Sequence, residues 1–121
     1  MNIFTSNFAT AKGLDDSKFM VVCISRFAPR GYKGVRCSVF APSLYLLRQY
    51  KAGLSQVEYE KCYRFEINCL GNIRKPFEGL ALLAKGRDIV LCCYENRDAF
   101  CHRHILSDIV FEKFGYRIKE L

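Results

Sequence analysis

The sequence predicts one α/β domain over residues 1–121, a three-layer sandwich with a mainly parallel central sheet flanked by helices. Two short runs, residues 19–24 and 88–94, are almost entirely apolar, as expected of strands buried on both faces of a parallel sheet. Segments with helical spacing of apolar residues alternate with these runs. The length fits a single domain, and no repeat or long linker divides the chain.

In the first half of the chain, strands are expected at residues 3–9 and 19–24, with a turn between them. Residues 26–39 are expected to be irregular, because a proline and two glycines interrupt any regular pattern. Ser43 is placed to cap a short helix that ends near Gly53.

In the second half, Ser55 and Glu58 match a capping box, in which each side chain satisfies a free amide at a helix start. A further helix is expected at residues 76–85, closed by Gly86, and the strongest strand follows at residues 88–94. The apolar residues expected along the capped helix are Val57, Cys62, Phe65 and Cys69.

The last helix is expected to begin at a cap formed by Asp98 and to end at Gly115, before a short strand at residues 116–118. Its inner face is expected to carry Phe100, Ile105, Ile109 and Val110.

The composition favours an anionic partner. Nineteen Lys and Arg against twelve Asp and Glu give a net charge of +7, which attracts nucleotides, nucleic acids or other acidic partners. The basic residues do not form a dense stripe, and a small basic protein is also simply well solvated.

The cysteines favour a reducing compartment. Their number, seven, is odd, and several lie in apolar runs, so a disulfide framework is not expected and the protein is predicted to be cytoplasmic. No apolar stretch approaches the roughly 20 residues that span a bilayer, so no membrane partner is expected. The cysteines expected in the core are Cys23, Cys69, Cys92 and Cys93.

Ligands of open α/β sheets bind at the carboxyl ends of the strands, and three segments of this chain lie there. Two of them supply candidate ligand-binding residues after the first and second strands: Thr5, Ser6 and Asn7, and then Ser25, Arg26, Tyr32 and Lys33. The third is the richest and runs from Tyr94 and Glu95 into Cys101, His102 and Arg103.

A helix start beside Arg103 predicts an anion site at this third segment. The first amides of a helix are unpaired and carry a partial positive charge, which favours a phosphate or carboxylate. The planar guanidinium of Arg103 can add a bidentate grip on that anion. The alternative is an exposed basic turn without a ligand.

The same segment offers catalytic candidates. Cys101 beside His102 has surroundings that favour a thiolate nucleophile, and Glu95 is placed to act as a general acid or base. The alternative is that Cys101 packs in the core and Glu95 is solvated. No metal or cofactor is expected, because Cys92, Cys101, His102 and His104 lack the spacing of a zinc motif. The tyrosines on the helices are expected to serve packing.

Two separated motifs resemble the bacterial and phage family called domain of unknown function 488. Residues 92–95 (Cys-Cys-Tyr-Glu) followed by residues 101–104 (Cys-His-Arg-His) are similar to its Cys-x-Glu and Cys-His-Arg pattern. Residues 24–32 are similar to its second motif, and residues 3–9 to its opening strand. The resemblance implies a compact α/β fold and one pocket that joins the motifs, but supplies no activity. Arg30 and residues 35–37 depart from the family pattern.

Three functions are compatible with these features. The first is a pocket that binds a nucleotide-derived or phosphorylated small molecule and turns it over. The second is a phage or defence-related protein that sequesters a nucleotide signal without turnover. The third is a basic domain that binds nucleic acid, which predicts a steep salt dependence. The sequence does not fix the ligand, the turnover or the oligomeric state.

Overall fold

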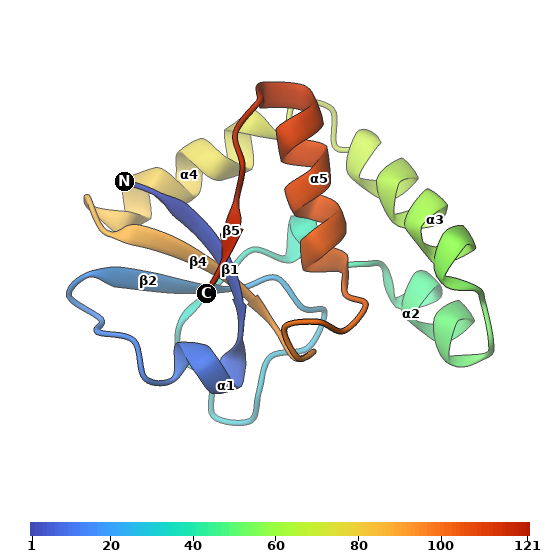
Figure 1. Cartoon of the computed structure of the whole chain (residues 1–121), viewed down its shortest axis with the longest axis horizontal. Helices are drawn as coiled ribbons and strands as arrows, with labels where there is room; N and C mark the ends of the chain where they lie inside the picture. Colours follow the sequence, from blue (N-terminus) through green and yellow to red (C-terminus); the bar gives the residue numbers. More distant parts are fainter.

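The computed structural model describes all residues, 1–121, and contains a five-stranded sheet whose strands are all parallel (Figure 1). The order across the sheet is β3-β2-β4-β1-β5. The α/β class and the parallel sheet that the sequence predicts are therefore confirmed. The strands are β1 (Ile3–Asn7), β2 (Phe19–Cys23), β3 (Val35–Arg36), β4 (Asp88–Cys93) and β5 (Lys119–Glu120).

Five α-helices and one 3-10 turn connect the strands. None of the helices has both the length and the apolar character needed to cross a bilayer. The helices are α1 (Phe8–Ala11), α2 (Leu44–Lys51), α3 (Gln56–Asn68), α4 (Arg74–Ala84) and α5 (His102–Phe114), and the 3-10 turn is η1 (Ser38–Phe40).

The two faces of the sheet are covered unequally. Side chains of β2 and β4 alternate between the faces, so Ile89 and Leu91 point to one side and Val90 and Cys92 to the other. The first side carries the main core, where residues of α2, α3, α4 and α5 pack on the sheet. The second side is covered by α1, through Ala11, and by aromatic side chains. Helices α3 and α5 lie side by side over the main core (Figure 1).

The connections create a switch point between β2 and β4, which are neighbours in the sheet. The chain leaves β2 toward β3 at one edge, whereas it leaves β4 through α5 toward β5 at the other. Adjacent parallel strands whose connections diverge leave a crevice at their carboxyl ends, and ligands of α/β proteins bind in such crevices.

The caps at Ser43, Ser55 and Gly115 are confirmed, but the reciprocal half of the capping box does not form, because the Glu58 carboxylate pairs with Lys61 instead of the Ser55 amide. The Ser43 hydroxyl accepts a hydrogen bond from the Leu46 amide, and the Ser55 hydroxyl accepts one from the Glu58 amide at 3.2 Å. Gly115 ends α5 in the left-handed conformation, with φ of 70°. These short-range signals hold because a cap depends on neighbours within one turn.

Several predicted boundaries are wrong. The first strand stops at Asn7, because the Asn7 side chain accepts a hydrogen bond from the Thr10 amide and starts α1. Helix α5 begins at Cys101 as its N-cap, so Asp98 stays in the preceding loop. The last strand comprises residues 119–120 instead of 116–118. The segment 26–39, which is expected to be irregular, contains the two-residue strand β3. Such short edge strands are defined by their partners across the sheet, not by an apolar pattern of their own.

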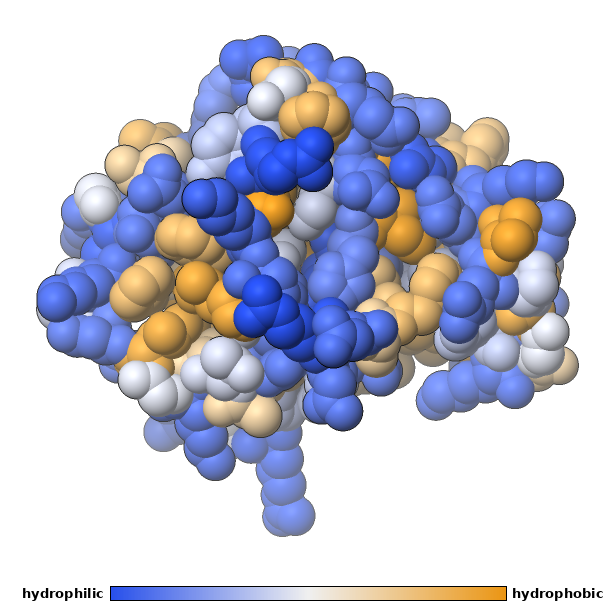
Figure 2. Space-filling model, viewed as in Figure 1, coloured by the Kyte–Doolittle hydropathy of each residue, from blue (hydrophilic) through white to orange (hydrophobic).

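The inner face predicted for α3 is also wrong. Tyr59, Tyr63 and Ile67 are the buried residues of this helix, whereas Val57 and Phe65 are each about two-thirds exposed. Tyr59 and Tyr63 are four residues apart and so share one face of the helix, where both pack in the main core and the Tyr63 hydroxyl donates to the Phe40 carbonyl at 2.6 Å. Figure 2 shows that the viewed face of the molecule is mainly hydrophilic, with exposed hydrophobic side chains in small separate groups.

Candidate functional site

A pocket of about 220 Å³ lies at the switch point, where β2 and β4 end and α5 begins. Helices α2 and α3 form its outer wall. It combines three kinds of lining: sulfur and imidazole atoms, cationic side chains, and aromatic rings. The lining includes Ser25, Arg26, Tyr50, Lys51, Tyr59, Cys93, Tyr94, Glu95, Phe100, Cys101 and His102.

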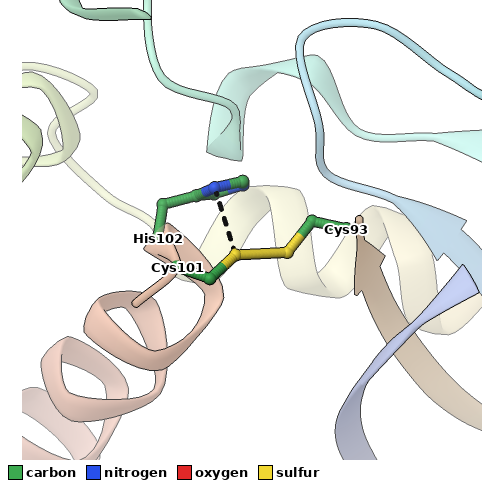
Figure 3. Close-up of side chains that lie close together, drawn as sticks. All are labelled: Cys93, Cys101 and His102. Atoms are coloured by element: carbon green, nitrogen blue, oxygen red, sulfur yellow. Dashed lines mark hydrogen bonds between the residues drawn. A yellow bond between two sulfur atoms is a disulfide. The ribbon is translucent and has the colours of Figure 1, made fainter. Parts of the chain in front are cut away.

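Two cysteines meet at the inner end of the pocket. Cys93 is the last residue of β4, Cys101 is the N-cap of α5, and their sulfur atoms form a disulfide (Figure 3). Both residues are buried. The other five cysteines are free, and Cys69 is exposed, so its predicted place in the core is wrong. Cys93 is buried as expected, but it is not a free thiol. The end of β4 faces the start of α5, and this places Cys93 against Cys101.

His102 follows Cys101 and is held in one orientation. Its Nε2 lies 2.7 Å from the carbonyl oxygen of Ile24. Because a carbonyl only accepts, Nε2 carries the proton and Nδ1 is left as an acceptor, 3.7 Å from the Cys101 sulfur. Burial lowers the pKa of His102 to about 4, since the charged imidazole is poorly solvated there. The ring is therefore neutral at pH 7.

Arg103 lies behind the pocket and is fully buried. Its Nε and Nη2 donate to the two carboxylate oxygens of Glu120 at 3.1 and 2.9 Å, and Nη2 also donates to the Asn96 carbonyl at 3.0 Å. Its Nη1 donates to the Cys93 sulfur at 3.0 Å. The anion that this guanidinium grips is thus part of the chain itself, and Arg103 does not line the pocket.

Glu120 is the anionic partner of this arrangement. Burial opposes its ionisation, but hydrogen bonds from Arg103 and from the Thr5 hydroxyl outweigh burial and hold the pKa of Glu120 below its ordinary value. The strand β5 thereby ties the carboxyl-terminal segment to the start of α5.

The cations at the pocket are Arg26 and Lys51. Arg26 donates from Nε to the Pro42 carbonyl at 3.0 Å, which holds the segment after η1 against the pocket. Neither side chain has a carboxylate partner. The Ser25 hydroxyl is buried beside them without a hydrogen-bond partner, and Glu95 is exposed at the rim. Nη2 of Arg26 also donates to the Ser38 and Ala41 carbonyls at 3.4 and 3.5 Å, so Nη1 is the part of this guanidinium left for a ligand, together with the Lys51 ammonium.

The outer wall of the pocket is aromatic. The rings of Tyr50, Tyr59 and Phe100 contact one another with centroids 4.9 to 5.7 Å apart. They come from α2, α3 and the loop before α5, respectively. Such a wall accommodates a flat ring by stacking or edge contacts.

The structure brings six candidates from the sequence into this pocket: Ser25, Arg26, Tyr94, Glu95, Cys101 and His102. Arg103 and five other candidates lie elsewhere. Thr5 and Ser6 bond the carboxyl-terminal residues, Asn7 caps α1, and the Tyr32 hydroxyl donates to the Val35 carbonyl at 2.7 Å. Lys33 is exposed on the loop before β3.

Sequence reasoning missed Cys93, Lys51 and the aromatic wall. Cys93 was detectable from strand alternation, because it shares a parity with Ile89 and Leu91, which face the helices. Cys92, the residue predicted among the donors, packs on the opposite face beside Val90. No sequence pattern around Lys51 predicts its place in the pocket, because it reaches the pocket only through the packing of α2 in the folded protein.

The sequence model of one protein family, described as the active DUF488-N3 subclade, matches residues 4–113. The chain belongs to the DUF488 family. The match covers β1 from its second residue, all of β2, β3 and β4, the pocket and nearly all of α5, and it confirms the resemblance seen in the sequence. Comparison with curated proteins found no match, and neither did comparison with solved structures.

Proposed function

We propose that this DUF488 protein binds an anionic, nucleotide-derived small molecule in the switch-point pocket and turns it over at the sulfur-lined end. The observation that carries the proposal is the combination, in one crevice, of an aromatic wall with two cations that have no carboxylate partner. A flat ring suits Tyr50 and Phe100, and a phosphate or carboxylate suits Lys51 and Arg26.

The size of the pocket supports a small ligand. Its volume of about 220 Å³ is below the roughly 300–1,000 Å³ of drug-sized ligand sites. A base with part of its sugar fits inside, with the anionic group at the rim near Lys51. No side chain caps the start of α5, so its first amides can add hydrogen bonds to an anion at the inner end.

Turnover is proposed because reactive groups converge on the same space. The acceptor Nδ1 of His102, the sulfurs of Cys93 and Cys101, and the solvated carboxylate of Glu95 all border the pocket. In this proposal Glu95 transfers a proton to or from the bound molecule, and His102 orients Cys101. The description of the matching subclade as active supports turnover over sequestration.

The test begins with mass spectrometry of small molecules released when freshly purified protein is denatured. We expect a nucleotide-derived or phosphorylated compound from the parent protein. Lys51→Ala is expected to weaken binding of that compound about ten- to hundredfold, since a hydrogen bond to a charged group is worth roughly 1.5–3 kcal/mol. Arg48→Ala, a basic position on the same helix but outside the pocket, is the matched control.

Two further results separate the alternatives. Loss of product with retained affinity in Glu95→Gln supports the enzyme, whereas tight binding without product in the parent protein supports sequestration. Failure to release any compound, together with no thermal stabilisation by nucleoside phosphates, contradicts the proposed pocket. Binding of nucleic acid that falls steeply with salt and ignores Lys51→Ala favours the nucleic-acid function.

A further inference from the structure

We propose that Cys93, Cys101 and His102, in their reduced form, bind one Zn²⁺ ion whose fourth coordination position opens into the pocket. Their donor atoms all lie within 4.8 Å of one another, and all three residues are buried (Figure 3). Two thiolates and one imidazole are ligands that zinc prefers over the hard cations Mg²⁺ and Ca²⁺. All three residues also line the pocket.

The distance between one sulfur and the histidine nitrogen already fits a single ion, and reduction of the disulfide frees the two sulfurs to separate to the roughly 3.8 Å that tetrahedral zinc requires. Zinc bonds of about 2.3 Å to sulfur and about 2.05 Å to nitrogen, at tetrahedral angles, place the two donor atoms about 3.6 Å apart. The Cys101 sulfur lies 3.7 Å from Nδ1 of His102. The Cα atoms of Cys93 and Cys101 are 7.8 Å apart, which is wider than the roughly 4.4–6.8 Å usual for a directly bonded pair. This backbone spacing suits two sulfurs that are bridged by an ion.

The surrounding residues orient the donors in the way that metal sites require. The Ile24 carbonyl accepts the Nε2 proton of His102, so the free nitrogen of the ring points to the sulfurs. Arg103 donates from Nη1 to the Cys93 sulfur at 3.0 Å, which stabilises a thiolate in the buried site. Both hydrogen bonds are made to the proposed metal-binding residues, and neither one occupies the side of the site that faces the pocket.

The charges and electrons balance. The disulfide is the oxidised form, and two molecules of a low-molecular-weight thiol reduce it to two cysteine thiols while forming one small-molecule disulfide. Binding of Zn²⁺ then displaces the two thiol protons. Two thiolates neutralise the ion, and Glu120 already neutralises Arg103, so the buried site carries no net charge.

Three protein ligands and one open position are the arrangement of a catalytic zinc site, whereas structural sites are closed by four protein ligands. A zinc ion here would hold a water or an anionic ligand group in the pocket that Glu95 also lines. The zinc site can be tested separately from the nucleotide-derived ligand, because zinc binding is measured with the metal alone.

The experiment uses the full-length protein, reduced and kept free of oxygen, and titrated with Zn²⁺ or Co²⁺ alone. We expect one tightly bound zinc per chain, thiolate-to-cobalt charge-transfer absorption in the cobalt form, and protection of Cys93 and Cys101 from alkylation by bound zinc. Cys93→Ser, Cys101→Ser and His102→Asn are each expected to weaken zinc binding by more than about a hundredfold, since even outer contacts of metal ligands are worth 10- to 100-fold.

Matched controls are Cys69→Ser, an exposed free cysteine, and His104→Asn, on the same helix as His102. Both are expected to keep full zinc binding. The proposal is overturned if the reduced parent protein binds no zinc, or if the controls lose as much affinity as the ligand variants. It is also overturned if zinc binds while both cysteines remain open to alkylation, which is measured on the parent protein and needs no variant to fold.

Discussion

Replacing Arg103 with methionine tests whether this residue supports the fold. Arg103 is completely buried, and its partner Glu120 is only 12% exposed at the side chain. Methionine keeps most of the volume but removes the donors to Glu120, Asn96 and Cys93. The carboxylate of Glu120 is then buried beside the Thr5 hydroxyl without its counter-charge.

The expected cost is about 3–5 kcal/mol of unfolding free energy, the range for breaking a buried ion pair by removing one partner. For a domain of this size, 1 kcal/mol corresponds to roughly 3–5 °C in Tm, so the melting temperature should fall by about 10–25 °C. The double variant Arg103→Met with Glu120→Gln should recover much of the loss, because no buried charge is left unpaired.

Chemical denaturation of the reduced protein, followed by circular dichroism, measures these differences. Arg64→Met is the matched control, because Arg64 pairs with Glu60 and Glu112 at the surface and should cost at most about 1 kcal/mol. The reasoning is refuted if Arg103→Met costs no more than Arg64→Met. It is equally refuted if the double variant is as unstable as the single one.

Two further predictions concern the residues packed around the pocket. The lowered pKa of His102 means that the folded state resists protonation, so its contribution to stability is complete above the unfolded pKa of 6.5 and is lost as the pH falls to the folded value of about 4. That loss amounts to about 3 kcal/mol of unfolding free energy. Denaturation at pH 7 and pH 4.5 should show that the unfolding free energy of His102→Asn falls less on acidification than that of the parent protein. An equal fall in both proteins would contradict a buried neutral ring. Tyr63→Phe should cost about 1–3 kcal/mol, because the Phe40 carbonyl loses its buried donor at 2.6 Å, whereas Tyr45→Phe at an exposed position should be neutral. Urea denaturation compares the two, and equal stabilities would show that this hydrogen bond adds nothing.

The family and the fold class could be predicted because their signals are local. Apolar runs such as residues 88–94 identify buried strands, and Ser55 and Gly115 mark helix ends through contacts within one turn. The motifs around Ser25 and Cys101 follow strands, so the general rule for parallel sheets placed them at one edge. The inner face of α3 could not be predicted in this way, because a helix with both tyrosines and aliphatic residues offers two apolar faces.

The sequence alone determined the family, the parallel α/β fold and the edge of the sheet where Ser25, Glu95, Cys101 and His102 gather. Only the tertiary structure decided which neighbours these residues have. It turned Arg103 inward to Glu120, which follows it by 17 positions, and set Cys93 instead of Cys92 against Cys101. The physical reason is that strand parity and the docking of α5 on the sheet fix the direction of each side chain, and both depend on contacts between segments distant in the sequence.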